Sequence, residues 1–375
     1  MDKFKISGDF NNVDWIELRE NSEIIKALTQ TDNKVLPPKW KKAIEVFENR
    51  IQTRFLNPIE KIKYEQLDKG EGFSITLIAV VLMEAMAAFQ FGKRYVERKA
   101  NKSYNSISPS EYTSSAGLYR DLFKDSNPLN RNTNSEVRKR FYSYIRCGLV
   151  HEARTKGPEL IISNTSERNT NSEKYYYKEG AHYIFNRDIF IDRLKEHFKN
   201  YLNKLNQPKE IQLRKNLVFK IDEICNIKHT WYFTYGSNLD EKQMNERLNN
   251  LGDFYLLKKL CRIKDYQFIY NKKSKDGSAK ANIKKDNGKD VYGIAYLIRE
   301  DTFYDFMKKY EKGYDVCELE AHYNHDKCFD VITAVSNKIT DKLPNKSYLD
   351  KIINGAEEQG IDPDYIKKNL SLNNL

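Results

Sequence analysis

The chain has 375 residues, of which 39% are hydrophobic and 31% charged, and its formal net charge is +11 at pH 7. This length allows two domains with separate cores, and the overall polarity excludes a membrane protein. The positive charge favours polyanionic partners such as RNA, although lysine-rich and asparagine-rich proteins show the same bias without binding them.

The five cysteines form no recognisable motif. They are Cys147, Cys225, Cys261, Cys317 and Cys328. They are widely scattered, contain no CxxC pair and follow no secretory leader, a pattern typical of free thiols in a reducing cytoplasm. His322 and His325 lack a nearby pair of thiolates at zinc-site spacing. We therefore predict a cytoplasmic protein with no metal and no cofactor.

The first half of the chain is predicted to be helical. Apolar residues recur at helical spacing over residues 38–54, 73–95, 135–156 and 188–205. Residues 73–91 are apolar for about the length that a bilayer requires, but Glu84 and Gln90 interrupt them. We interpret this segment as the central helix of a bundle and expect no membrane contact. A short strand or hairpin is expected around residues 160–163 and 182–185.

The second half of the chain changes to short β-rich runs. Residues 207–228 are basic and helical in tendency, and Pro208 suits a domain junction. After them, strands are predicted at 230–234, 266–270, 291–298, 317–323 and 329–335, and a helix at 347–370. The predicted organisation is an N-terminal domain at 1–206, a linker helix at 207–228 and a C-terminal domain at 229–375.

Residues 231–239 predict a ligand-binding loop. The sequence WYFTYGSNL indicates a strand that ends in a small-residue loop, followed by a helix beginning at Asp240. Gly236 and Ser237 would let a carboxylate or carbonyl oxygen approach the backbone amides closely, and the helix start would add its positive dipole end.

The loop Tyr235-Gly236-Ser237-Asn238 resembles the YGSN substrate loop of the γ-glutamylcyclotransferase family. Other parts of the family pattern follow in order, over about 140 residues in all. They are a strand pair at 274–283 and 291–296, a helix with an E-x-G-Y element at 306–314, and a terminal helix at 348–356 and 363–366. The resemblance implies a mixed β-barrel with flanking helices, so we expect an α plus α/β protein overall.

The resemblance also implies a catalytic residue, Glu311. In that family a glutamate is the general base that lets the α-amino group of a γ-glutamyl substrate attack its own γ-carbonyl and form 5-oxoproline. Burial would suit this role by raising the glutamate pKa towards neutrality. Tyr235, Tyr314 and Arg247 are candidate pocket residues or structural residues. Alternatively, Glu311 is a solvated helix-end carboxylate among lysines, or the site binds a ligand without catalysis.

A second candidate site lies in the N-terminal half. Apolar residues at helical spacing from Val137 to Leu149 predict a helix with a buried face, and Arg146 and His151 flank it. Their R-x4-H spacing resembles the ribonuclease motif of HEPN (higher eukaryotes and prokaryotes nucleotide-binding) domains. The resemblance implies an all-helical bundle that cleaves RNA without metal, as a homodimer.

The helical geometry also favours a dimer for this second site. Five residues rotate an α-helix by about 500°, so Arg146 and His151 are expected on different faces, and a two-fold dimer would bring two such helices to one phosphate. Glu84 is predicted to orient Arg146 or His151. The alternative is structural: Arg146 pairs with Glu84, and His151 only closes the helix end.

Together these patterns predict a cytoplasmic bacterial two-domain effector, a HEPN-like ribonuclease fused to a γ-glutamylcyclotransferase-like module, in toxin or phage-defence work. The expected partners are RNA and a small γ-glutamyl compound. Two alternatives stay open. One is a metabolic cyclotransferase whose helical half only dimerises, and the other is a non-catalytic module that recognises a phage component.

Overall fold

The structure is a computed structural model that describes residues 3–30, 35–65, 70–97, 105–124, 128–166, 171, 173–324 and 327–371. The chain forms two compact units. The helical unit comprises residues 1–18, 31–95 and 112–220, and the barrel unit comprises residues 19–30, 96–111 and 221–375. The last passage between the units lies within α10 (Ile211–Ile224), inside the segment expected to be the linker.

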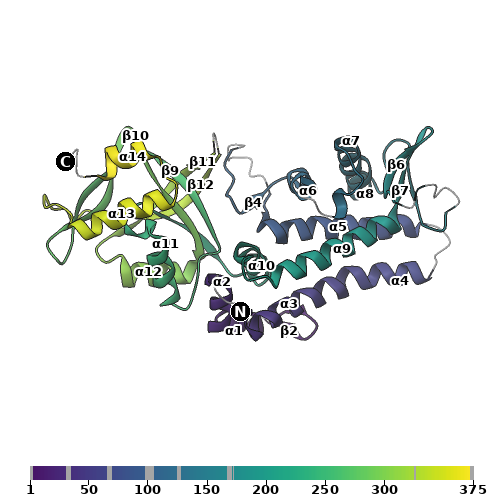
Figure 1. Ribbon diagram of the computed structural model, residues 1–375, viewed down its shortest axis with the longest axis horizontal. Helices are drawn as coiled ribbons and strands as arrows, with labels where there is room; N and C mark the ends of the chain where they lie inside the picture. Colours follow the sequence, from purple (N-terminus) through teal and green to yellow (C-terminus); the bar gives the residue numbers. More distant parts are fainter. Residues whose placement is uncertain are drawn as a thin grey trace. The chain divides into compact units, whose positions relative to one another are not determined.

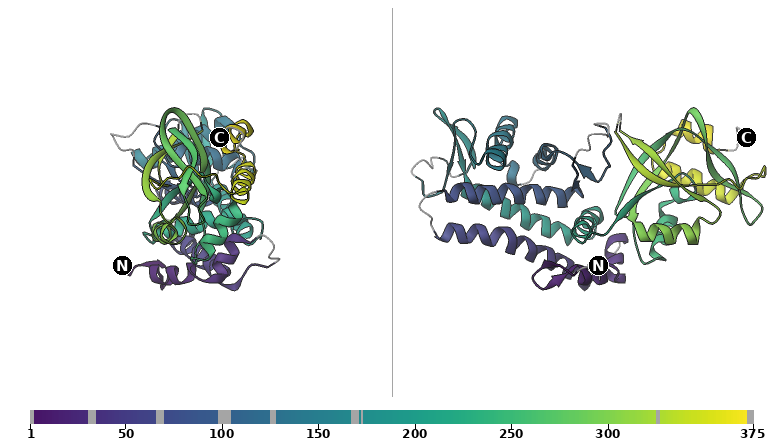
Figure 2. Two further views of the ribbon diagram at one scale, coloured as in Figure 1. Left: turned by 90° about the vertical axis from the view of Figure 1, so that its left-hand side faces the viewer. Right: turned by 180° about the vertical axis from the view of Figure 1, so that it is seen from behind.

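The helical unit is organised around three long helical segments. α3 (Pro38–Ile51) continues through a π-helical turn, η1 (Gln52–Leu56), into α4 (Asn57–Glu65). α5 (Glu71–Phe91) and α9 (Arg187–Leu205) lie side by side in Figure 1 and in the reversed view of Figure 2. The shorter elements are β1 (Lys5–Ser7), β2 (Phe10–Asn11), α1 (Asn12–Arg19), β3 (Arg94–Tyr95), β4 (Glu111–Tyr112), α6 (Ser115–Lys124), η2 (Pro128–Asn130), α7 (Ser135–Arg140), η3 (Phe141–Arg146) and α8 (Cys147–Glu152).

The apolar helix α5 belongs to the core of this unit. By length and composition alone it could cross a bilayer, but 56% of its most apolar 18-residue window is buried inside the structure. Phe89 of α5 packs on Phe47 of α3 with ring centroids 4.7 Å apart, and Phe47 also contacts Phe198 of α9 at 5.9 Å. These aromatic contacts join the three long segments in one core.

A small sheet in the helical unit corrects the prediction of an all-α N-terminal domain. β6 (Tyr176–Glu179) and β7 (His182–Asn186) form a hairpin, and β5 (Glu159–Ile162) pairs in parallel with β7. Gly180 has φ +55°, which suits the two-residue loop of such a hairpin. The weak strand signals at 160–163 and 182–185 therefore mark real strands that bury one face on the helices.

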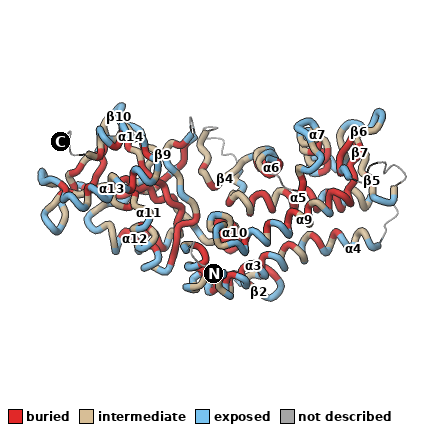
Figure 3. The backbone as a smooth tube through the Cα atoms, viewed as in Figure 1, coloured by how far each residue is buried: buried red, intermediate tan, exposed pale blue. Residues whose placement is uncertain are grey.

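The barrel unit contains a closed barrel of five strands. The strands are β8 (His229–Thr234), β9 (Leu257–Lys273), β10 (Ala279–Arg299), β11 (Asp315–Tyr323) and β12 (Lys327–Val335), in the order β10-β8-β12-β11-β9. Only the β12–β8 pair among these is parallel. Helices and strands therefore occur together as the predicted α plus β organisation requires, and both buried and exposed positions occur along the strands (Figure 3).

One glycine on β10 explains how the barrel closes beside the loop. Phe233 is fully buried and pairs with Ala295 of β10. A side chain at Gly293 would place its Cβ 2.2 Å from the Thr234 carbonyl oxygen and 2.7 Å from the Phe233 ring. Glycine is therefore required where β10 crosses the end of β8.

Short helices flank the barrel and fix the loop that follows β8. They are α2 (Ser22–Thr29), η4 (Ser237–Leu239), α11 (Glu241–Asn249), α12 (Glu300–Tyr310), α13 (Lys346–Glu358), α14 (Pro363–Tyr365) and η5 (Ile366–Leu370). A Cβ at Gly355 of α13 would lie 2.5 Å from the Asp240 backbone nitrogen. This glycine lets α13 pack directly on the backbone after the loop and holds the loop in place.

Candidate active site

The loop Tyr235–Asn238 connects β8 to a single 3-10 turn, η4, rather than directly to a long helix. α11 begins at Glu241, and the Asp240 side chain accepts a hydrogen bond from the Gln243 N–H to cap it. The N-terminus of α11 is therefore already capped by the chain itself. A Cβ at Gly236 would contact Ala281 Cβ at 3.3 Å and the Tyr348 hydroxyl at 3.4 Å, so the glycine allows both to approach the loop.

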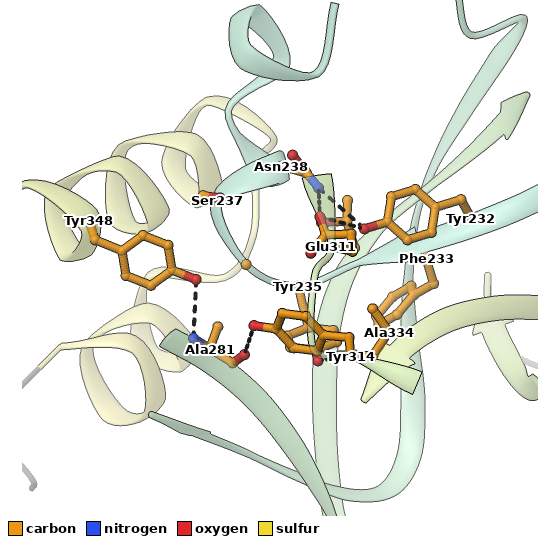
Figure 4. A pocket seen from close by; sticks show the side chains of 12 residues that line it. Tyr232, Phe233, Tyr235, Ser237, Asn238, Ala281, Glu311, Tyr314, Ala334 and Tyr348 are labelled. Carbon is orange, nitrogen blue, oxygen red and sulfur yellow. Dashed lines mark hydrogen bonds between the residues drawn. The ribbon is translucent and has the colours of Figure 1, made fainter. Parts of the chain in front are cut away.

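Glu311 lies at the end of α12 and faces this loop (Figure 4). Its backbone carbonyl accepts a hydrogen bond from the Tyr314 N–H at 3.2 Å, which closes a four-residue turn. Gly313 has φ +80° in that turn, a conformation that favours glycine. The E-x-G-Y pattern is therefore a turn that brings Glu311 and Tyr314 into one pocket.

Three neighbours contact one oxygen of the Glu311 carboxylate. Oε1 accepts hydrogen bonds from Asn238 Nδ2 at 2.8 Å and from the Tyr232 hydroxyl at 3.3 Å, and it lies 3.6 Å from Arg247 Nη1. Among the described residues, no hydrogen bond or ion pair involves Oε2. The side chain is 12% exposed. One oxygen is thus fixed, and the other is available to a ligand proton.

Burial decides the proton affinity of Glu311. Desolvation raises the pKa of this carboxyl above its ordinary value, while Arg247, Asn238, Tyr232 and Lys272 lower it, in that order, without cancelling the rise. The expected elevation of the Glu311 pKa is therefore present in the structure. A carboxyl with a raised pKa holds a proton more strongly than an exposed one, which suits a group that accepts a proton and releases it again.

Tyrosine hydroxyls and backbone groups form the rest of the pocket wall. The Tyr235 hydroxyl donates to the Ala334 carbonyl oxygen, and the Tyr314 hydroxyl donates to the Ala281 carbonyl oxygen at 2.6 Å. The Tyr348 hydroxyl accepts from the Ala281 N–H at 3.1 Å (Figure 4). Burial raises the pKa of all three phenols, so they remain neutral.

Two connected cavities border Glu311. The inner one has a volume of about 30 Å³ and lies between the Tyr235–Asn238 loop, Ala281 and Glu311. It has room for about two water-sized groups. The outer one has a volume of about 420 Å³, shares Ser237, Glu311 and Tyr348 with the inner cavity, and is open to solvent. Tyr314 also lines both cavities, so the two spaces meet around Glu311.

The structure brings together every residue that the sequence assigned to the C-terminal site. Tyr235, Gly236, Ser237, Asn238, Glu311 and Tyr314 line the inner cavity, and Arg247 lines the outer one. Tyr235 and Tyr314 bond to backbone carbonyls, so they also hold the barrel together. Glu84, Arg146 and His151 belong to the helical unit.

Sequence reasoning missed three members of the site: Tyr232, Gln243 and Tyr348. Tyr232 packs on Phe306 of α12 with ring centroids 5.4 Å apart, a contact between distant residues that no local pattern in the sequence indicates. Gln243 Nε2 donates to Ser237 Oγ at 3.0 Å. Tyr348 enters the pocket from the first turn of α13, where the Asn345 cap accepts from its N–H at 3.0 Å.

The residues of the second predicted site also lie together, but not as expected. Arg146 Nη2 forms an ion pair with Glu84 Oε2 at 2.7 Å, and Arg146 Nη1 lies 3.4 Å from His151 Nε2. Arg146 and His151 therefore meet within one copy of the chain, although the helical rotation between them led us to expect that a dimer would be needed to bring such groups together. Helical rotation fixes only the Cα–Cβ directions, whereas a long arginine side chain carries its guanidinium to partners on neighbouring faces.

One group of possible metal ligands lies on the β11–β12 hairpin. Ligand atoms of Glu320, His322 and Cys328 come within 4.8 Å of one another, because His322 and Cys328 are cross-strand partners. Burial raises the pKa of the Cys328 thiol to about 11, so an ion bound here would have to displace the thiol proton. His325 lies outside the described residues.

Comparison with known proteins gives partial structural similarity only. No family model matches the chain, and no curated protein is significantly similar to it. A solved structure described as a γ-glutamyl cyclotransferase aligns over 37% of this chain and 85% of its own, with 19% identity and a TM-score of 0.33. YkqA from Bacillus subtilis aligns over 39% of this chain and 54% of its own, with 18% identity and a TM-score of 0.33. A yeast γ-glutamyl cyclotransferase specific to glutathione aligns over 36% of this chain and 90% of its own, with 10% identity and a TM-score of 0.29.

Proposed function

We propose that the barrel unit is a γ-glutamylcyclotransferase that converts a γ-glutamyl amide into 5-oxoproline and a free amine. The observation that carries this proposal is the buried Glu311 carboxyl, held through Oε1 by Asn238 and Tyr232 beside a cavity of about 30 Å³. The α-amino and α-carboxyl groups of a glutamyl moiety are small enough for that inner space. The remainder of the substrate would occupy the outer cavity.

In the proposed reaction Glu311 moves protons between two nitrogens of the same substrate. The carboxylate takes a proton from the α-ammonium, and the freed amine attacks the γ-carbonyl carbon to form the lactam C–N bond. The bond from that carbon to the leaving nitrogen then breaks. In total the attacking nitrogen loses two protons and the leaving nitrogen gains two, so neither water nor an oxidant is consumed.

Positioning would supply much of the rate enhancement, because the attacking α-amine and the γ-carbonyl with its leaving amine belong to one molecule. Gly236 lets the loop backbone approach the ligand, and Gln243 fixes Ser237 through its carbonyl and hydroxyl oxygens at 3.0 Å each. Arg247 Nη1 donates to Asn238 Oδ1 at 2.7 Å and so orients the amide that holds Glu311. These contacts hold the Glu311 carboxylate in one orientation.

The test is to incubate the purified protein with γ-glutamyl dipeptides and quantify 5-oxoproline by mass spectrometry. We expect wild-type protein to form it and Glu311→Gln to form almost none, with Glu311→Asp intermediate because it keeps the carboxyl but shortens its reach. Absence of 5-oxoproline with every dipeptide would refute the proposal.

A second function, RNA cleavage by the helical unit, is favoured by the contact between Arg146 and His151. A guanidinium that can hold a phosphate lies 3.4 Å from an imidazole that can move a proton, and His151 is exposed. The Glu84–Arg146 ion pair equally fits the structural role considered for this arginine. The proposed setting is a cytoplasmic homodimeric effector in toxin or phage defence, with the barrel unit binding or cyclising a γ-glutamyl compound.

RNA incubation in EDTA distinguishes this second function from its alternative. If total or transfer RNA is cleaved by wild type but not by Arg146→Ala or His151→Ala, the effector proposal holds. If wild type leaves RNA intact while forming 5-oxoproline, the chain is a metabolic cyclotransferase whose helical unit serves dimerisation. Arg154→Ala, at an exposed surface ion pair, is the matched control for loss of positive charge.

A further inference from the structure

The outer cavity beside Glu311 is strongly basic. Its lining contains Arg247, Lys272, Lys280 and Lys351, whereas Glu311 is the only carboxylate among the lining residues. Glu311 already faces Arg247 at 3.6 Å, and Lys280 Nζ lies 3.2 Å from the carboxylate of Asp276, just outside the cavity. The remaining positive charge of the outer cavity, which no carboxylate of the described residues pairs with at short distance, therefore comes from Lys272 and Lys351.

Lys272 is unusual because it is almost buried. It is 9% exposed, its Nζ donates to the Lys312 carbonyl oxygen at 3.0 Å, and it lies 4.7 Å from the centre of the Tyr314 ring. Burial lowers the pKa of Lys272, which reflects the cost of keeping an ammonium there. Among the ion pairs of the described residues none includes Lys272. The charge of Glu311 offsets part of this cost, and a ligand anion at hydrogen-bond distance would offset more of it.

Lys351 provides a second positive charge on the opposite element. It projects from α13, and its Nζ donates to Gln243 Oε1 at 2.9 Å, so Gln243 joins it to the Ser237 backbone. In the described part of the chain no carboxylate pairs with Lys351 either. The two lysines come from β9 and α13 and border one cavity of about 420 Å³.

We propose that the outer cavity selects γ-glutamyl dipeptides whose leaving amino acid carries two carboxylates, as glutamate or aspartate does. This inference rests on the proposed cyclotransferase function. The γ-glutamyl moiety itself is a zwitterion without net charge, so it cannot balance Lys272 and Lys351. A leaving amino acid with an α-carboxylate and a side-chain carboxylate brings two negative charges to the two lysines.

The sharpest probes are γ-glutamyl-glutamate and γ-glutamyl-glutamine, which have almost the same shape and differ by one charge. We expect wild-type protein to cyclise the glutamate compound with roughly 10- to 100-fold higher kcat/KM, the range for one charge-assisted hydrogen bond. γ-Glutamyl-lysine should be the poorest of the three. Raising the salt concentration should reduce the preference, since screening weakens exposed charge interactions.

Substitution of Lys272 and Lys351 tests whether these residues cause the preference for γ-glutamyl-glutamate over γ-glutamyl-glutamine. Lys351→Gln should reduce the ratio of kcat/KM values for the glutamate and glutamine compounds, and Lys272→Met should do so as well. Lys342→Gln, an exposed lysine that does not line the cavity, is the matched control and should leave the ratio unchanged. Because Lys351 is exposed at the surface, its variant remains informative if the Lys272 variant folds poorly.

Calorimetric binding of both dipeptides to Glu311→Gln separates failure of this inference from failure of the proposed function. Equal kcat/KM values and equal affinities for the two compounds would overturn the charge selection while leaving the cyclotransferase intact. No 5-oxoproline, together with tighter binding of γ-glutamyl-glutamate, would overturn the cyclotransferase while keeping the charge selection. An unchanged ratio in Lys351→Gln and Lys272→Met would also overturn the selection by these lysines.

Discussion

The two units each place a glutamate beside an arginine, but the two pairs differ in distance and in the other partners of the carboxylate. In the helical unit Glu84 lies 2.7 Å from Arg146, and the Tyr112 hydroxyl donates to it at 3.4 Å. In the barrel unit Glu311 lies 3.6 Å from its arginine and takes its shorter hydrogen bond, 2.8 Å, from the neutral amide of Asn238.

This difference separates a carboxylate with a guanidinium partner at 2.7 Å from one that accepts hydrogen bonds from the neutral groups of Asn238 and Tyr232. A close guanidinium stabilises the charged form of a carboxyl, whereas burial with neutral donors lets desolvation dominate. The raised pKa of Glu311 shows the second situation, despite the nearby positive charges. In the functions proposed above, Glu84 positions Arg146 and Glu311 is the general base.

The largest expected difference between the two glutamates is catalytic. Glu311→Gln should lower the rate of 5-oxoproline formation by roughly 100- to 10,000-fold, because it removes the proton carrier. Glu84→Gln should leave that rate within a factor of two, because Glu84 belongs to the helical unit. The measurement is kcat/KM by product quantification, with the exposed Glu318→Gln as control. Equal losses in both glutamate variants would contradict the comparison.

A smaller effect is expected when the hydrogen bond from Tyr232 to Glu311 is removed. Tyr232→Phe should lower kcat/KM by about tenfold, the value of one hydrogen bond to a charged group. Because this bond lowers the pKa of Glu311, its loss should move the acidic limb of the pH–rate profile to higher pH. Tyr304→Phe, on the exposed side of α12, is the control. A limb that stays in place would exclude Glu311 as the titrating base.

Stability should depend on pH through Glu311 in a defined direction. Its folded pKa is raised, so the folded chain binds a proton that the unfolded chain releases above about pH 4.3. The stabilising contribution is complete below that pH and is lost as the pH rises through the folded pKa. Urea unfolding should therefore show wild type losing stability relative to Glu311→Gln over this window. The opposite trend would mean that the carboxylate form is favoured by folding.

The smallest effect concerns the ion pair in the helical unit. Glu84→Gln should lower the free energy of unfolding by about 1 kcal/mol, because both side chains are partly exposed, 20% for Glu84 and 14% for Arg146. Chemical denaturation measures this, with Glu152→Gln at a surface ion pair as control. If Glu84→Gln changes neither stability nor any RNA cleavage, Glu84 does not position Arg146 for either purpose.

The parts of the barrel site that the sequence predicted correctly are those that depend on local sequence patterns. The YGSN loop and the E-x-G-Y turn each depend on a glycine with a specific backbone role, Gly236 and Gly313, and such roles are visible in sequence. The Glu311 pKa shift could be expected only in direction, because burial depends on the packing of α12 against β8. The strand runs of the second half lie within the observed strands β8 to β12.

What sequence could not predict depends on contacts between distant residues. Lys272 and Lys351 meet at one cavity only because β9 and α13 pack around the same pocket. Short strands were expected at 160–163 and 182–185, but the parallel pairing of β5 with β7 joins segments separated by the β6 strand, and the HEPN resemblance implied an all-helical bundle without this sheet. The Arg146–His151 contact likewise depends on side-chain reach rather than on helical phase.

The most direct test of the central claim is to follow wild-type protein with γ-glutamyl-glutamate in ¹⁸O-labelled water. The proposed intramolecular attack predicts equimolar 5-oxoproline and glutamate, neither of which incorporates ¹⁸O during turnover. Release of two glutamates, one of them labelled in its γ-carboxyl group, would show hydrolysis by water and contradict the assignment of Glu311 as the base of a cyclisation.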